Sequence, residues 1–93
     1  MGGLIEEIKD PNIENGTMEI IGDTFIKIKT DNIFTFDGSL AAEWKVDKKY
    51  PVTLTLDPND PRNVTVKWNS PYSGQFDLYY GDFKKTVVVE SLF

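Results

Sequence analysis

Apolar and polar side chains alternate along much of this chain with a repeat of two residues. In the segment 52–56 one valine and two leucines lie on one side and two threonines on the other. The segments 63–69 and 75–80 repeat the alternation, with Val64, Val66 and Trp68 on one face of the first. A repeat of two is typical of β-strands that bury one face. The β-branched and aromatic residues in these segments also favour strands.

Five further segments are predicted to be strands, although their patterns are less regular. They span residues 17–21, 24–29, 33–36, 41–46 and 85–92. Between the first two of them, Gly22-Asp23 predicts a tight hairpin turn. Near the C-terminus, the run of valines at 87–89 indicates either a strand covered on both faces or an edge strand that meets a partner.

Turn residues separate the predicted strands at a spacing of about 8–12 residues, which is typical of a sandwich or a barrel. The turns are predicted at 37–39, 47–49, 57–61, 70–74 and 81–82. One helical turn is possible at 4–9, and Asp10-Pro11 would end it. Residues 1–16 are therefore interpreted as an N-terminal arm, and residues 17–93 as a single β-domain.

The composition excludes several kinds of chemistry. The chain has 93 residues, with no histidine and no cysteine, so histidine-based nucleophile systems and the usual zinc sites cannot form within it. The net charge is −5 and the sole arginine is Arg62, which disfavours binding to nucleic acid. No segment has the length of a membrane span or the form of a signal peptide. We expect no enzyme activity, no cofactor, no nucleic acid and no membrane partner.

The segment 41–90 carries a family resemblance. Its order is Ala42-Glu43-Trp44-Lys45-Val46, then Asn63-Val64-Thr65-Val66-Lys67-Trp68, then Ser73-Gly74-Gln75-Phe76-Asp77-Leu78-Tyr79-Tyr80, and then Lys85-Thr86-Val87-Val88-Val89-Glu90. This order resembles the PKD-like and related bacterial Ig-like domains. The resemblance implies an immunoglobulin-like β-sandwich of about seven strands. It also implies a spacer, adhesive or decorating role in bacterial surface proteins or phage virions.

Aromatic side chains supply the candidate binding residues. Trp44 and Trp68 lie on predicted inward faces and are assigned to the core, with a sugar-stacking platform as the alternative, chiefly for Trp68. Tyr72, Tyr79 and Phe83 are the candidate surface-binding residues, because exposed aromatic side chains often mark interfaces. They are placed in a loop, on an outward strand face and in a loop, respectively. Tyr50 is a further candidate for exposure.

The acidic side chains are assigned structural roles in a turn and on a solvent-exposed face. Asp57, Asn59 and Asp60 crowd one loop and offer oxygen ligands for calcium. Prolines flank them, however, and Asp-Pro and Asn-Asp pairs are ordinary turn chemistry. Glu43, Asp77 and Glu90 alternate outward on predicted strands and are interpreted as part of a solvated face.

Two hypotheses for function follow from the sequence. The first is a structural accessory module, such as a phage virion decoration or auxiliary capsid protein. It would bind another virion protein or its own copies, and Leu4, Ile5 and Ile8 of the arm would contact the neighbour. The chain begins with its own methionine and ends soon after the last predicted strand. Both features favour a free-standing small protein. The second is a spacer or glycan-binding domain of a bacterial cell-surface protein, with Tyr72, Tyr79 and Phe83 in contact with sugar.

Overall fold

The computed structural model describes residues 17–91, which form eight β-strands and no helix. The strands are β2 (Glu19–Ile21), β3 (Phe25–Lys27), β4 (Asp31–Asp37), β5 (Trp44–Lys45), β6 (Val52–Leu56), β7 (Asn63–Trp68), β8 (Gly74–Tyr80) and β9 (Phe83–Glu90). The arm residues Leu4, Ile5 and Ile8 lie outside the described part of the chain.

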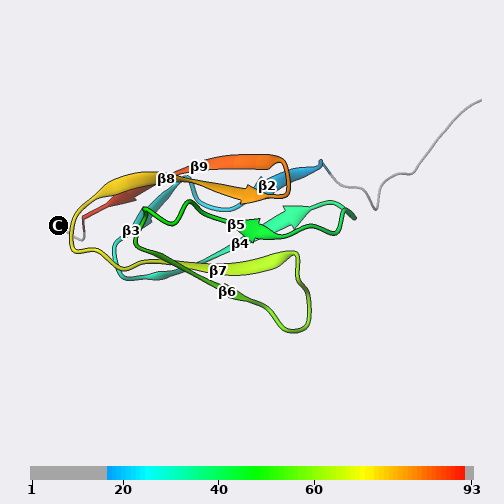
Figure 1. Cartoon of the computed structure of the whole chain (residues 1–93), viewed down its shortest axis with the longest axis horizontal. Helices are drawn as coiled ribbons and strands as arrows, with labels where there is room; N and C mark the ends of the chain where they lie inside the picture. Colours follow the sequence, from blue (N-terminus) through cyan, green and yellow to red (C-terminus); the bar gives the residue numbers. More distant parts are fainter. Residues whose placement is uncertain (1–16, 92–93) are drawn as a thin grey trace, which may run out of the picture.

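The strands form two sheets of four that pack as a sandwich (Figure 1). One sheet has the order β2-β4-β7-β6 and the other β3-β9-β8-β5. Neighbouring strands are antiparallel, except that β3 runs parallel to β9. The predicted all-β sandwich is therefore confirmed.

The predicted hairpin at Gly22-Asp23 is wrong. Ile20 pairs with Phe36 in one sheet, whereas Ile26 pairs with Val89 in the other. The chain thus crosses between the layers where a hairpin was expected. The crossing buries both isoleucines. It also gives each sheet an edge strand, β2 beside β4 in one and β3 beside β9 in the other. The described chain has eight strands, where the family resemblance implied about seven.

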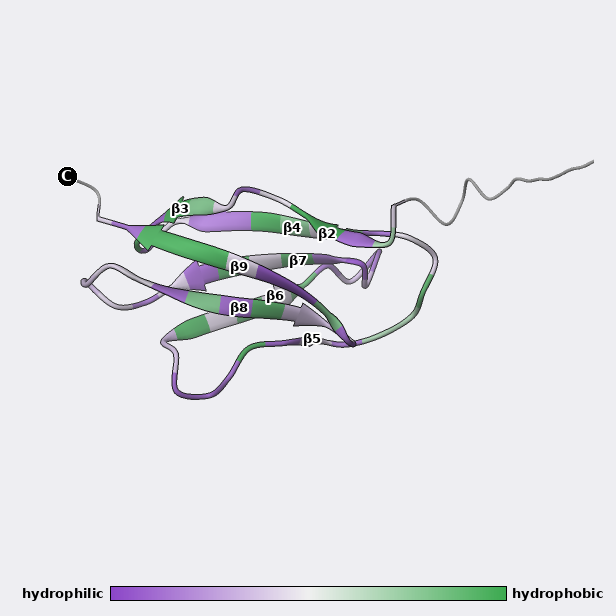
Figure 2. Cartoon of the chain, turned by 90° about the horizontal axis from the view of Figure 1, so that it is seen from above, coloured by the Kyte–Doolittle hydropathy of each residue, from purple (hydrophilic) through white to green (hydrophobic). Residues whose placement is uncertain are grey.

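The core lies between the two sheets and is built from the inward side chains of every described strand except β6, whose Val52 and Leu54 are only partly buried against it. Its members are Ile20, Ile26, Ile28, Phe34, Phe36, Trp44, Val64, Val66, Trp68, Phe76, Leu78, Tyr80, Val87 and Val89. No polar or charged residue in the range 17–91 is buried. Figure 2 shows the resulting alternation as green and purple segments along β8. The repeat of two in the sequence therefore identifies the inward face correctly.

The connection between β8 and β9 is a hairpin of the tightest kind. Tyr80 pairs directly with Phe83, so only Gly81 and Asp82 lie between the strands. Gly81 has φ = +59°, the left-handed conformation that a type II′ turn needs at its first central position and that glycine adopts without steric cost. The predicted turn at 81–82 is confirmed, and β9 begins earlier than the predicted residue 85.

The three valines near the end of β9 alternate instead of facing one environment. β9 lies between β3 and β8, so it is an interior strand of its sheet. Val87 and Val89 point into the core, while Val88 is half-buried on the outer face opposite Phe25 of β3. The expectation of an edge strand is therefore wrong, and the outer face of this strand is only partly covered.

Candidate interaction surfaces

Both tryptophans belong to the core, as the sequence predicted. Trp44 and Trp68 are 8% and 5% exposed. Each indole N–H donates to a loop carbonyl, Trp44 to Pro61 at 2.9 Å and Trp68 to Tyr72 at 2.8 Å. The ring of Trp68 stacks on Phe76 with centroids 5.8 Å apart. Neither ring offers a free face to a sugar, so the stacking-platform alternative for Trp68 is wrong.

Phe83 and Tyr50 are not exposed aromatic side chains, and the prediction for both is wrong. Phe83 is the first residue of β9, not a loop residue, and its ring lies 5.0 Å from that of Phe36. Tyr50 packs beside the stacked pair of Trp68 and Phe76, with centroid distances of 6.4 and 6.3 Å. The two-residue turn before Phe83 is the physical cause, because it places this residue in the strand ladder on the inward side.

Tyr72 and Tyr79 are accessible, but they do not form one surface. Tyr72 lies in the β7–β8 loop and is 77% exposed. Tyr79 is half-buried on the outer face of the β3-β9-β8-β5 sheet. β8 begins at Gly74, next to the loop, and Tyr79 lies five residues further along the strand. At ~3.3 Å per residue, Tyr79 lies ~17 Å along the strand from Gly74, and Tyr72 lies before Gly74 in the loop.

Two lysines flank Tyr79 across the sheet. The register places Lys45 of β5 on one side of it and Lys84 of β9 on the other. Directly opposed side chains have Cβ atoms about 5 Å apart, so the three form one row on the outer face. Both lysines are exposed, and no ion pair or side-chain hydrogen bond joins either one to the described residues. The sequence analysis missed this row, because the lysines become neighbours of Tyr79 only through strand pairing.

The neighbouring polar side chains on the same face bond to one another across the strands. Thr86 donates to the Asp77 carboxylate at 2.7 Å, and Lys27 pairs with Glu90 at 3.2 Å. These contacts link neighbouring strands and occupy the carboxylates. Asp77 and Glu90 both lie on the outer face as predicted, with Glu90 exposed and Asp77 half-buried. Lys45, Tyr79 and Lys84 have no such contact with the described residues.

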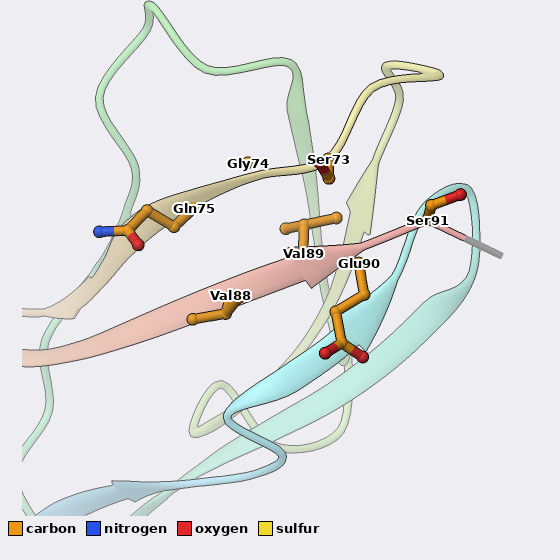
Figure 3. Close-up of a pocket in the computed structure, with 7 residues that line it drawn as sticks. All are labelled: Ser73, Gly74, Gln75, Val88, Val89, Glu90 and Ser91. Atoms are coloured by element: carbon orange, nitrogen blue, oxygen red, sulfur yellow. The ribbon is translucent and has the colours of Figure 1, made fainter. Parts of the chain in front are cut away.

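An open groove lies at the opposite end of the β8–β9 ladder, as Figure 3 shows. Its lining residues are Ser73, Gly74, Gln75, Val88, Val89, Glu90 and Ser91. Glu90 is the sole titratable side chain among them, and it is the carboxylate that pairs with Lys27. The groove therefore brings together no pair of groups suited to acid–base chemistry.

The acidic loop between β6 and β7 uses its carboxylates to hold its own backbone. Asp57 accepts from the backbone N–H of Asn59 at 2.8 Å. Asp60 accepts three hydrogen bonds from Arg62, one from its backbone and two from its guanidinium. These bonds lower the pKa of Asp60 below its ordinary value of 3.8 and raise the pKa of Arg62. Arg62 also donates to the carbonyl of Gly38 at 3.0 Å, which ties this loop to the β4–β5 connection.

Residues 17–91 contain neither a cluster of metal-ligating side chains nor a membrane-spanning helix. No three acidic side chains in that range gather closely enough to hold a metal ion. No helix there has the length and apolar character to cross a membrane. The turn interpretation of Asp57, Asn59 and Asp60 accounts for the contacts that the loop makes.

One solved structure resembles the whole domain. It is described as "Crystal structure of the S-layer protein SbsC domains 4 and 5", and it superposes with a TM-score of 0.51 at 16% sequence identity. The match covers 94% of this chain and 56% of that chain. No protein-family model matches the sequence, and no curated protein matches it either. The likeness establishes the fold, and the chain spans little more than half of the two-domain structure that it resembles.

Proposed function

We propose that this chain is a non-enzymatic structural domain of a bacterial surface protein. The observation that carries the proposal is the likeness of nearly the whole chain to part of a two-domain S-layer structure. A single sandwich domain that superposes on about half of a two-domain structure is what we expect of one spacer repeat. The resemblance of 41–90 to bacterial Ig-like domains supports the same role. A surface protein is therefore favoured over the virion decoration, which rests on the sequence alone.

The structure supports this role by what its core is made of. The fourteen buried side chains are all apolar or aromatic, and no described polar residue is buried. Such a core stabilises one rigid arrangement by packing, with no buried charge pair whose protonation could loosen it. A spacer needs this kind of cooperative, inert unit.

The test is cooperative unfolding together with the absence of turnover. Scanning calorimetry of the full chain should show a single transition, with calorimetric and van't Hoff enthalpies that agree. Generic ester, glycoside and phosphate substrates should remain unchanged at neutral pH. A turnover that persists through repurification, and that a point variant abolishes without loss of fold, would overturn the proposal.

A second candidate function is binding of an acidic glycan at Tyr79. The row of Lys45, Tyr79 and Lys84 offers two ammonium groups on either side of an aromatic ring. A uronic acid residue presents a carboxylate for the lysines and an apolar sugar face for the ring. This row, and not the predicted set of Tyr72, Tyr79 and Phe83, is the glycan site that we propose.

Titration with polygalacturonate fragments tests this candidate, with neutral maltooligosaccharides as the control ligand. K45A/K84A and Y79A should each weaken binding by about tenfold or more. Lys67→Ala is the matched control variant, because Lys67 is exposed on the outer face of the other sheet. Equal binding by all variants, or no binding by the wild type, would remove the glycan role and leave the spacer role intact.

A further inference from the structure

β6 is an edge strand without any charge. Each sheet ends in two edge strands, β2 and β6 in one and β3 and β5 in the other. Glu19, Lys27 and Lys45 place a charged residue in β2, β3 and β5, respectively. Charged side chains and short length are the usual means by which an edge resists pairing with another strand. β6 has five residues, Val-Thr-Leu-Thr-Leu. It is therefore protected neither by a charged side chain nor by short length.

The backbone of β6 has hydrogen-bonding groups that face away from its sheet. Asn69 donates to Pro51 at one end of the β6–β7 ladder, and Asp57 donates to Asn63 at the other. Antiparallel bonding alternates along a strand, so Thr53 and Thr55 direct their N–H and C=O groups to β7. The N–H and C=O groups of Leu54 and Leu56 consequently point outward, toward the open edge.

The side chains of β6 present an apolar border at that edge. Leu54 is half-buried against the core, and Leu56 is 54% exposed. Leu56 lies beside Trp44 and Pro61, in a groove between the two sheets. Thr53 and Thr55 occupy the outer face and are exposed. In Figure 2, β6 is green and near-white, without a purple segment.

From this edge we infer that two copies of the chain pair through β6, antiparallel about a two-fold axis at Leu54. The strand is self-complementary in that register, as a two-fold interface requires. Leu54 exchanges both backbone hydrogen bonds with its counterpart. Thr53 of one copy faces Thr55 of the other, and Val52 faces Leu56. The four-stranded sheets join into one sheet of eight strands across the dimer.

A second copy can pair at β6 without placing charged residues of the two strands opposite one another. The chain carries a net charge of −5, so two copies repel unless their contact lies away from the acidic side chains. β6 is the described edge strand that contains no charged residue, and the acidic side chains nearest to it, Glu43 and Asp57, lie beside Leu56 at one end of the strand. The dimer needs only this edge, and it therefore stands whether or not the outer face of the other sheet binds a glycan.

The mass of the full chain in solution, measured by sedimentation equilibrium across a wide concentration range, tests the dimer. The mass of the wild type should rise from 10.6 kDa toward twice that value. T53E/T55E and T53K/T55K each place like charges opposite one another in the proposed register. Each variant alone should have a dissociation constant at least about tenfold higher. A mixture of the two should associate again, because each of the two glutamates then faces a lysine.

Lys67→Glu is the matched control. It changes the charge by the same −2 as T53E/T55E, on the same sheet face, but one strand in from the edge. The control should associate as the wild type does. Recovery in the mixture also excludes unfolding as the cause of the loss, since unfolded variants would not recover. A wild type that is monomeric at every concentration would overturn the inference, as would an oligomer whose mass neither charged variant changes.

Discussion

The hydroxyl of Tyr80 donates a 2.7 Å hydrogen bond to the carbonyl of Leu40, although the two residues are forty positions apart. The same hydroxyl accepts from the backbone N–H of Ala42 at 3.1 Å. The ring of Tyr80 stacks on Phe36 in the opposite sheet, with centroids 4.4 Å apart. One side chain thus joins both sheets to the β4–β5 connection that passes between them.

Tyr80→Phe should destabilise the domain by about 1–3 kcal/mol. The substitution preserves the ring packing but removes the partner of one carbonyl and one N–H in a half-buried loop, and unmade bonds of this kind cost about that much. Urea denaturation should show a lower midpoint with an unchanged m-value. Tyr72→Phe, at a position that is 77% exposed, should stay within about 0.5 kcal/mol of the wild type. Equal midpoints for both variants would contradict the bridging role.

Gly22→Ala should destabilise the domain by about 1–3 kcal/mol or more, because it would force atoms into a filled core. A Cβ atom at Gly22 would overlap the ring of Phe34. That ring is fully buried and cannot move aside. Asp23→Ala, at the exposed neighbouring position, is the control and should have little effect. Thermal unfolding of the two variants and the wild type measures these differences in stability. A Gly22→Ala variant as stable as the wild type would mean that the crossing between the sheets is loosely packed.

Two Gly-Asp pairs show how much of the fold the sequence predicts. Alternation alone identifies β6, β7 and β8 almost to their ends, because each buries one face and follows the repeat of two. Gly22-Asp23 and Gly81-Asp82 look alike locally, yet only the second closes a hairpin. The first joins strands of opposite sheets, and that difference depends on the partners β4 and β9, which are distant in sequence. Local turn chemistry carries no information about those partners.

The candidate site was predicted only in part, for the same reason. The outward position of Tyr79 follows from the alternation of its own strand. Lys45 and Lys84 lie thirty-four and five positions away, and only the register of three strands brings them beside it. Phe83 was predicted to lie in a loop because the last strand was predicted to begin at residue 85, two residues after its actual start. Exposure on one strand can be predicted from sequence, whereas a site assembled across strands needs the pairing.

Phe83→Ala should lower stability by about 2 kcal/mol, whereas Tyr79→Ala should cost less than about 1 kcal/mol. Phe83→Ala loses packing against Phe36 and the core. Removal of an aromatic ring from a core costs several kcal/mol when the ring is fully buried. Tyr79 is half-buried on the outer face and touches no core ring. Chemical denaturation of the two variants measures both values. The reverse order would assign Phe83 to the surface, as the sequence suggested.

Asp60→Asn should reduce stability at neutral pH by an amount that shrinks in acid. The pKa of Asp60 is lowered in the folded protein, chiefly by the hydrogen bonds from the Arg62 side chain. The charged carboxylate therefore stabilises the fold above the ordinary pKa of 3.8, and this contribution is lost as the pH falls through the lower folded value. The gap in unfolding free energy between wild type and variant should thus be full at pH 6 and narrow below pH 3.8.

Arg62→Gln tests the same ion pair from its other member. This variant should show a gap with the same dependence on pH, because the 3.1 Å contact needs both charges. It should also be the less stable of the two variants, since Arg62 loses its bond to the carbonyl of Gly38 as well. Added salt should shrink the gap at neutral pH, because both groups are accessible to solvent. A gap that stays constant from pH 6 to pH 3 would show that Asp60 acts only by hydrogen bonding, without any contribution from its charge.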